Sequence, residues 1–302
     1  MNIGALFENF LRRRADRRDR PYVVGAYSIT LPAGHQLDCY QKQFRNYDRK
    51  LPVIAAMVAA KYPDTVIVDI GANVGDSAAA LRSAVTSPIV CVEGNPAFLP
   101  YLTRNLALLP GTNRIIARFV GPATGAMTRF DVATARGTAH LVPVTSGATA
   151  PSDRLITVEE LLAQISGLGT VRLFKSDTDG FDFSILQWSM ESFVAARPVL
   201  FFEFDPSIGV SSAEDALRTA SGLVQVGYRH VVVYDNFGNY LLGTDLSQSL
   251  AHDLVTSAKQ RLLAGGGAFY FDLCCFAPGD EDLFTALVRR ERESVAPTPE
   301  PR

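Results

Sequence analysis

Acidic residues and glycines stand together where an apolar stretch of this chain ends. Residues 66–70 are apolar and β-branched apart from Asp69, and Gly71 and Gly75 bound the turn that follows. Such a run before a helix, expected here over 76–85, is typical of a buried parallel strand. Glycines allow a tight reversal and leave bare backbone N–H groups for a ligand. The turn therefore offers a binding surface made of main chain.

A second apolar strand, predicted over 88–93, ends at Glu93. About twenty residues beyond a glycine turn is the position from which a carboxylate holds the hydroxyls of a ribose. Strand, turn, helix, strand and acid together predict a nucleoside pocket. The spacing Gly71-x-x-x-Gly75 lacks the glycine that lets a pyrophosphate approach, which argues against NAD and FAD.

The same turn resembles motif I of the S-adenosylmethionine-dependent methyltransferases, in particular the FkbM family with its D-I-G-A-N-x-G signature. Glu93-Gly94-Asn95-Pro96 is similar to the family segment E-P-N-P, and residues 175–182, KSDTDGFD, are similar to K-I-D-x-E-G-x-E. Tyr47-Asp48-Arg49 also resembles a family element. The likeness covers about residues 22–205, and the departures from it are Gly94, Ser176, Asp179 and Asp182.

The resemblance implies S-adenosylmethionine as the cofactor and a hydroxyl acceptor, often on a sugar, a glycolipid or a polyketide-type natural product. In an open α/β sheet the ligand lies beyond the carboxyl ends of the strands. With this cofactor, Asp69 and the backbone of the turn are expected at its amino-acid end, and Glu93 at its ribose. The predicted cofactor-binding residues are Asp69, Gly71, Ala72, Asn73, Gly75, Glu93, Asn95 and Val120, the last two on the adenine side.

Methyl transfer to oxygen needs a base for the acceptor proton. Asp177, Asp179 and Glu203 are the candidates, and Lys175 is a neighbour able to lower the pKa of a carboxylate. The predicted catalytic residues are Asp177, Lys175 and Glu203. The structural alternative to a catalytic role for Asp177 is that it caps the N-terminus of the helix that begins near Phe183. His35 is of interest because the segment before the core is expected to close over the pocket.

Two other classes of function remain open. Asp177-Thr178-Asp179 has the D-x-D pattern of metal-dependent glycosyltransferases, and with Glu203 these acids suit Mg²⁺. Short acidic motifs arise often by chance, so no metal site is predicted. A binding protein that keeps the fold without catalysis is the second alternative.

Composition and charge indicate which kinds of partner the chain is suited to bind. The chain has 302 residues, 47% of them hydrophobic, with 29 basic and 31 acidic residues, so no charge excess calls for nucleic acid. Four cysteines without metal spacing are expected in the core of a cytoplasmic protein. Residues 3–20 form a basic amphipathic segment that suits packing on a protein surface or, alternatively, peripheral membrane contact. A homodimer is plausible without a motif to support it.

Strands alternating with helices predict an α/β chain with a doubly wound, Rossmann-like sheet of seven mostly parallel strands. The resemblance implies that the last strand is antiparallel. Three parts are expected: an N-terminal layer (1–62), a methyltransferase domain (63–278), and a terminal helix with a disordered tail (279–302). The predicted strands after the first two cover 114–120, 171–176, 199–204, 230–234 and 269–276, with an antiparallel excursion at 127–132 and 140–144, a loop at 145–153 and an N-terminal strand at 22–31.

Overall fold

The computed structural model of the chain describes residues 18–122, 130–135, 138–143, 154–208, 212–265 and 269–295. The amphipathic segment up to residue 17, the predicted loop at 145–153 and the tail at 296–302 lie outside these residues. Among the residues described, no helix is both long and apolar enough to cross a membrane.

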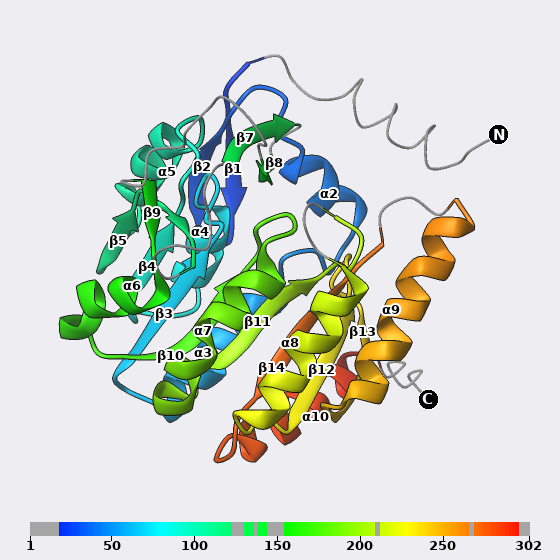
Figure 1. Cartoon of the computed structure of the whole chain (residues 1–302). Coiled ribbons are helices and arrows are strands. Elements are labelled where there is room, and N and C mark those ends of the chain that lie inside the picture. The colour runs from blue at the N-terminus through cyan, green and yellow to red at the C-terminus, as the bar shows by residue number, and fades with distance from the viewer. Residues whose placement is uncertain are drawn as a thin grey trace, which may run out of the picture.

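A central eight-stranded sheet organises the molecule (Figure 1), with strand order β13-β12-β14-β11-β10-β3-β4-β5. Strands β3, β4, β5, β10 and β11 are parallel to their neighbours in this group, whereas β14 runs antiparallel to both β11 and β12. The bounds are β3 Thr65–Ile70, β4 Ile89–Val92, β5 Asn113–Ile116, β10 Thr170–Ser176, β11 Val199–Phe204, β12 His230–Asp235, β13 Tyr240–Asp245 and β14 Phe271–Phe276.

This order confirms the predicted fold class, since a final antiparallel strand is inserted between two strands of a doubly wound sheet. The seven predicted strands are present, and β13 adds an eighth at the edge. The predicted strand 114–120 is divided, because the chain leaves the sheet after Ile116 and pairs again at β6 (Phe119–Val120) with β9 (Leu155–Ile156). The expected antiparallel excursion is the pair β7 (Phe130–Ala135) and β8 (Thr138–Pro143).

Two apolar cores fill the faces of the sheet. One includes Phe174, Phe202 and Phe204 and lies under α6 to α9, and the other includes Ile67, Leu173 and Tyr234 and lies under α3, α4, α5 and α10. Every residue of β3 is buried, as expected for a strand covered on both faces. The helices are α3 Lys50–Lys61, α4 Asp76–Arg82, α5 Leu99–Leu106, α6 Val158–Ile165 with a 3₁₀ turn at Ser166–Leu168, α7 Asp182–Ala196, α8 Ala213–Gln225, α9 Gln248–Leu263 and α10 Glu281–Val295.

The N-terminal layer begins with a hairpin rather than the single strand predicted over 22–31. Strands β1 (Arg20–Val24) and β2 (Tyr27–Leu31) pair antiparallel, and Gly25 takes φ +58° at the turn between them. Helix α2 (Leu37–Gln43) follows. The side chain of Asn105 on α5 fixes β2, accepting from Thr30 N at 2.8 Å and donating to its carbonyl at 3.0 Å. This layer is therefore attached to the helices beside the glycine turn.

The segment after α2 docks onto the turn that follows β12. Phe44 stacks on Phe237 with ring centroids 3.9 Å apart, and Asn46 Nδ2 donates to Asn239 Oδ1 at 2.9 Å. Gly238 has φ +76°, and a Cβ there would lie 2.2 Å from the Asn46 carbonyl oxygen. The close approach of the two backbones therefore requires glycine at 238.

Gly238→Ala is expected to lower the free energy of unfolding by more than the ~1–2 kcal/mol that a left-handed backbone alone costs an L-residue. The reason is the collision with Asn46 in addition to the backbone strain. Urea unfolding of both variants measures this against Gly34→Ala, because Gly34 has φ +79° but no atom within 4 Å of its Cβ position. Equal losses in the two variants would show that the contact with Asn46 adds nothing.

Candidate functional site

The glycine turn after β3 is shaped by a close crossing with the chain after β10. Gly71 has φ +75°, and a Cβ on it would lie 1.8 Å from the carbonyl oxygen of Asp177. The Asp177 N–H donates to Ile70 O at 3.1 Å, which holds the two strand ends together. Asn73 (φ +47°) and Gly75 (φ +86°) complete the left-handed turn before α4. Glycine is therefore required at 71 by the close approach of the chain after β10.

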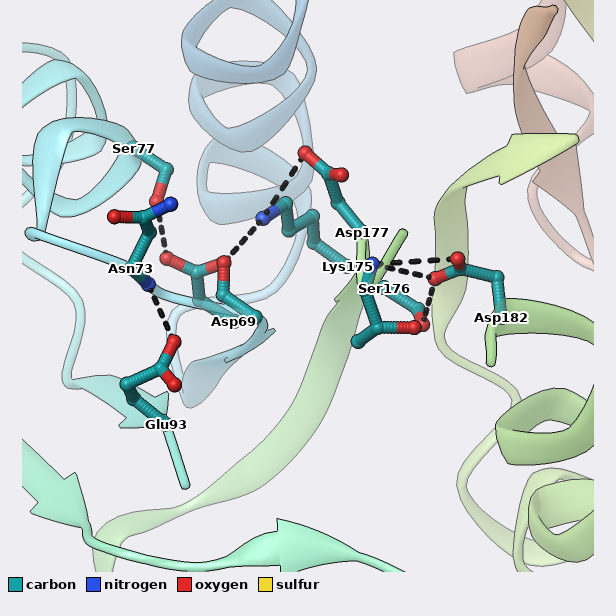
Figure 2. Close-up of polar contacts among 10 residues, drawn as sticks. Asp69, Asn73, Ser77, Glu93, Lys175, Ser176, Asp177 and Asp182 are labelled. Carbon is teal, nitrogen blue, oxygen red and sulfur yellow. Dashed lines mark hydrogen bonds and ion pairs between the residues drawn. The ribbon is translucent and has the colours of Figure 1, made fainter. Parts of the chain in front are cut away.

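Glu93 holds this turn from the neighbouring strand end. Its Oε2 accepts from Asn73 N at 2.9 Å, and its Oε1 accepts from Asn95 N at 2.7 Å. The side chain is buried, and burial raises its pKa against the lowering effect of these two backbone donors. The carboxylate therefore orders both predicted binding segments at once, and Figure 2 shows its bond to Asn73.

A buried ion pair lies behind the turn. Lys175 Nζ lies 2.9 Å from Asp69 Oδ1 and 3.6 Å from Asp177 Oδ2, and it donates to Gly71 O at 3.3 Å. Ser77 Oγ donates to the other oxygen of Asp69 (Figure 2). Burial acts to lower the pKa of Lys175, but the two carboxylates outweigh it and raise that pKa. Asp69, with no exposed surface, thus supports the turn from beneath.

Asp182, at the start of α7, organises the segment between β10 and that helix. Its Oδ1 accepts from Ser176 Oγ at 2.6 Å, and its carboxylate accepts from Thr178 N at 3.1 and 3.2 Å. Burial and the charge of Asp177 raise the pKa of Asp182 to about 6. In the sequence, Asp182 stands out only as a departure from the family segment, and its bonds to Ser176 and Thr178 appear only in the structure.

These elements form a pocket that is partly open to solvent, with about 550 Å³ of space between its walls and at its mouth. Of the residues named in the sequence analysis as binding or catalytic candidates, those that line it are Gly71, Asn73, Glu93, Val120, Asp177 and Asp179. Arg118, Thr178 and a set of apolar and aromatic side chains that the sequence analysis did not select complete the wall. These apolar and aromatic residues are Ile70, Val92, Phe98, Phe119, Phe181 and Ile185.

The other predicted residues lie behind or beside this wall. Ala72 is buried, and Asn95 is buried where its Oδ1 accepts from Ala97 N at 3.0 Å. Gly75 begins α4 and packs towards Leu102 and Leu106. These residues shape the backbone of the site rather than its surface.

Glu203 lies deeper, near the end of β11. It is paired across the sheet with Asp272 on β14, so that both side chains project from the same face. Burial, followed by the charges of Asp177 and Asp182, raises the pKa of Glu203 well above its usual range. The structure therefore surrounds this carboxyl with other acids and favours its protonated form.

His35 lies in the N-terminal layer, where it is buried and accepts from Leu37 N at 3.3 Å through Nδ1. Burial lowers the pKa of His35, partly opposed by the charge of Asp76. The imidazole is therefore neutral and faces α4.

The acids do not converge on a metal. Within the described parts of the chain, no group of three or more His, Cys, Asp or Glu side chains is arranged to hold a metal ion.

Comparison with known proteins gives structural similarities alone. No protein-family model matches the chain, and no curated protein sequence matches it. The FkbM methyltransferase of Methylobacillus flagellatus superposes with a TM-score of 0.35 at 14% identity over 56% of this chain, which spans 39% of that protein. The magnesium protoporphyrin IX methyltransferase of Synechocystis, solved with S-adenosylmethionine, gives 0.40 at 11% identity, covering 80% of this chain and 86% of that one. The plantazolicin methyltransferase BamL gives 0.41 at 7%, covering 80% and 88%. These similarities are weak, and the fold is assigned from strand order and direction.

Asp182→Ala is expected to cost about 1–3 kcal/mol of stability, because the Ser176 hydroxyl and the Thr178 N–H lose their acceptor. Asp182→Asn, which keeps one oxygen, is the matched control and should lose less.

The pKa of the Asp182 carboxyl is raised on folding, so the stability it contributes is present below about pH 4 and is lost as pH rises through 6. Unfolding measured from pH 4 to 7 should therefore show a flatter pH profile for Asp182→Asn than for the wild type. Parallel profiles would contradict the assigned shift.

Proposed function

We propose that the chain is an S-adenosylmethionine-dependent O-methyltransferase with its cofactor in the pocket above β3 and β4. One observation carries the proposal: Glu93, at the end of β4, lines the pocket and binds the glycine turn at the end of β3. In a doubly wound sheet this is where a nucleoside's ribose lies.

The residues present fit this cofactor. An ionised carboxylate has about four acceptor positions, and the backbone N–H groups of Asn73 and Asn95 use two of those on Glu93. The remaining positions suit the two hydroxyls of a ribose. Val120, Phe119 and Ile185 give an apolar wall for an adenine ring, and the bare backbone at Gly71 suits the amino-acid end.

When bound, S-adenosylmethionine supplies an electrophilic methyl group for in-line transfer. Asp177 is the predicted catalytic residue with access to that region, because it lines the pocket and 55% of its side chain is exposed. Lys175 positions Asp177 and the turn by bridging both to Asp69. Glu203, buried and favouring its protonated form, is a poor proton acceptor.

The acceptor is proposed to be a hydroxyl of a sugar, a glycolipid or a natural product, following the resemblance to the FkbM family. Membrane contact through residues 3–20, a homodimer and a cytoplasmic location remain proposals that this site neither requires nor opposes.

Calorimetric titration with S-adenosylmethionine, S-adenosylhomocysteine and UDP-glucose, with and without Mg²⁺, tests the proposal. Micromolar binding of both adenosyl ligands without dependence on Mg²⁺ is expected. Binding of UDP-glucose that requires Mg²⁺, with no response to the adenosyl ligands, would favour the glycosyltransferase alternative instead. If the chain were instead a non-catalytic binding protein, the Glu93→Ala variant would keep the biological role of the wild type.

A further inference from the structure

Two carboxyl groups stand side by side where β10 and β11 reach the rim of the site. These strands are parallel, and their register pairs Ser176 with Phe202. The next residue of each chain is an acid, Asp177 after β10 and Glu203 within β11. Asp177 still follows the sheet, because its N–H donates to Ile70 O at 3.1 Å. Since neighbouring strands lie about 4.8 Å apart, the register places the two acids next to each other.

The two side chains also project from the same face of the sheet. Alternate residues of a strand share a face, so Asp177 points to the side of Lys175, whose Nζ lies 3.6 Å from Asp177 Oδ2 (Figure 2). By the same rule Glu203 points to the side of Phe201, the register partner of Lys175. Across β14, Asp272 is paired with Glu203. Glu203 therefore stands between two other acids on one face.

The surroundings of the two carboxyls differ. Glu203 is 5% exposed, whereas 55% of the Asp177 side chain is exposed. Among the residues that the structure describes, none forms an ion pair with Glu203 and no main-chain N–H donates to it. A buried carboxylate without a cation or a donor is costly, and two adjacent carboxylates do not both ionise readily. Asp177, beside Lys175, therefore keeps the negative charge, and Glu203 keeps the proton.

We propose that Glu203 is a positioning residue that donates a hydrogen bond from its protonated carboxyl to the Asp177 carboxylate, an inference that rests on the proposed methyltransferase function. A hydrogen bond between a carboxylic acid and a carboxylate is short and strong. Lys175 holds Asp177 from one neighbouring group, and Glu203 holds it from another. The exposed Asp177 side chain is thereby kept in one orientation at the wall of the pocket.

The two carboxyls take different parts in the transfer. Asp177 lines the pocket, so the proton of the acceptor hydroxyl passes to Asp177 and from its exposed side chain to water. The new oxygen–methyl bond forms as the sulfur–methyl bond breaks, and the electron pair of that bond returns to sulfur. The proton on Glu203 stays in place throughout. The products are the methyl ether, S-adenosylhomocysteine and the released proton.

The electrostatics of Glu203 agree with this role. Burial and then the charge of Asp177 raise its pKa, and a hydrogen bond between these two side chains acts in the same direction. A hydrogen bond that only the protonated form can donate stabilises that form. The other titratable groups that act on Glu203 or face it are Asp179, Asp182, Asp272 and Tyr270.

Infrared difference spectra of the full chain at pH 7, without ligand, test the hydrogen bond directly. The wild type should show the carbonyl band of a protonated carboxylic acid that Glu203→Gln lacks. This band should shift in Asp177→Asn, because the acceptor of the hydrogen bond loses its charge. It should stay in place in Asp64→Asn, since Asp64 precedes β3 at the opposite end of the sheet. Loss of a carboxylate band in Glu203→Gln instead, or a protonated band that Asp177→Asn leaves unmoved, would overturn the inference.

Two variants of similar side-chain length separate positioning from other roles. Glu203→Gln keeps a neutral donor for Asp177, whereas Glu203→Met removes it. Transfer of radiolabelled methyl groups to the best acceptor in a panel of sugars and polyols should stay within about threefold of the wild type in Glu203→Gln and fall about 10- to 100-fold in Glu203→Met. Equal losses would show that Glu203 itself accepts the proton, and equal retention that it does not position Asp177. Either result would contradict the inference.

The binding of S-adenosylhomocysteine distinguishes failure of this inference from failure of the proposed function. Glu203 does not line the pocket, so both variants should bind this ligand with the affinity of the wild type. A wild type that binds neither adenosyl ligand would overturn the proposed function, and the role of Glu203 in transfer with it, whatever the infrared band shows. Normal binding without the protonated band would overturn the role of Glu203 alone.

Discussion

Lys175→Met is expected to lower the free energy of unfolding by about 3–5 kcal/mol, because it leaves the fully buried carboxylate of Asp69 without its cation. The ammonium also holds Gly71 O and Asp177, so its loss removes the bridge between two strand ends. Chemical denaturation at pH 7 measures the loss directly.

The double variant Lys175→Met with Asp69→Asn is the control for this prediction. Removing both charges leaves no unpaired buried ion, so the double variant should recover much of the lost stability. The losses of the single variants Lys175→Met and Asp69→Asn should therefore not add up in the double variant. Additive losses would contradict the prediction, because the ion pair would then contribute no coupling energy.

Glu93→Ala is expected to weaken the binding of S-adenosylhomocysteine by about 5- to 150-fold, which corresponds to the ~1–3 kcal/mol lost when a buried hydrogen-bond partner is removed. The same substitution frees the N–H groups of Asn73 and Asn95, so part of the loss reflects a disordered turn. Titration calorimetry below the unfolding temperature of the variant measures the affinity.

Glu93→Gln separates these two contributions. Its single carbonyl oxygen can keep one backbone N–H, whereas its amide group donates and cannot accept from a ribose hydroxyl. Stability should therefore lie closer to the wild type than that of Glu93→Ala, while affinity falls in both variants. Unchanged affinity in both variants would show that Glu93 does not bind the cofactor.

Strands that are buried on both faces were predictable, because their sequences are nearly continuous apolar runs. Strands β3, β10 and β11 appear as apolar runs, and the fold followed from their alternation with helices. Strand β13 gave no such signal, since it is half-exposed at the edge of the sheet and contains Gly243. The hairpin at residues 20–31 differs from the single strand predicted over 22–31 because the reversal occupies only Gly25 and Ala26.

The site was predictable only where chemistry coincides with the end of a strand. Glu93 and Asp177 could be selected from their positions, and both line the pocket. The location of Asp69 behind the turn depends on Lys175, 106 positions away in the sequence, and on Ser77.

Hydrogen–deuterium exchange with and without S-adenosylhomocysteine tests most directly whether an adenosyl cofactor occupies this pocket. Slower exchange is predicted in peptides that contain the glycine turn, residues 92–98, residues 118–120 and residues 177–181, and no change is predicted in α9 and α10. Unchanged exchange throughout, or protection confined to α9 or α10, would contradict the account.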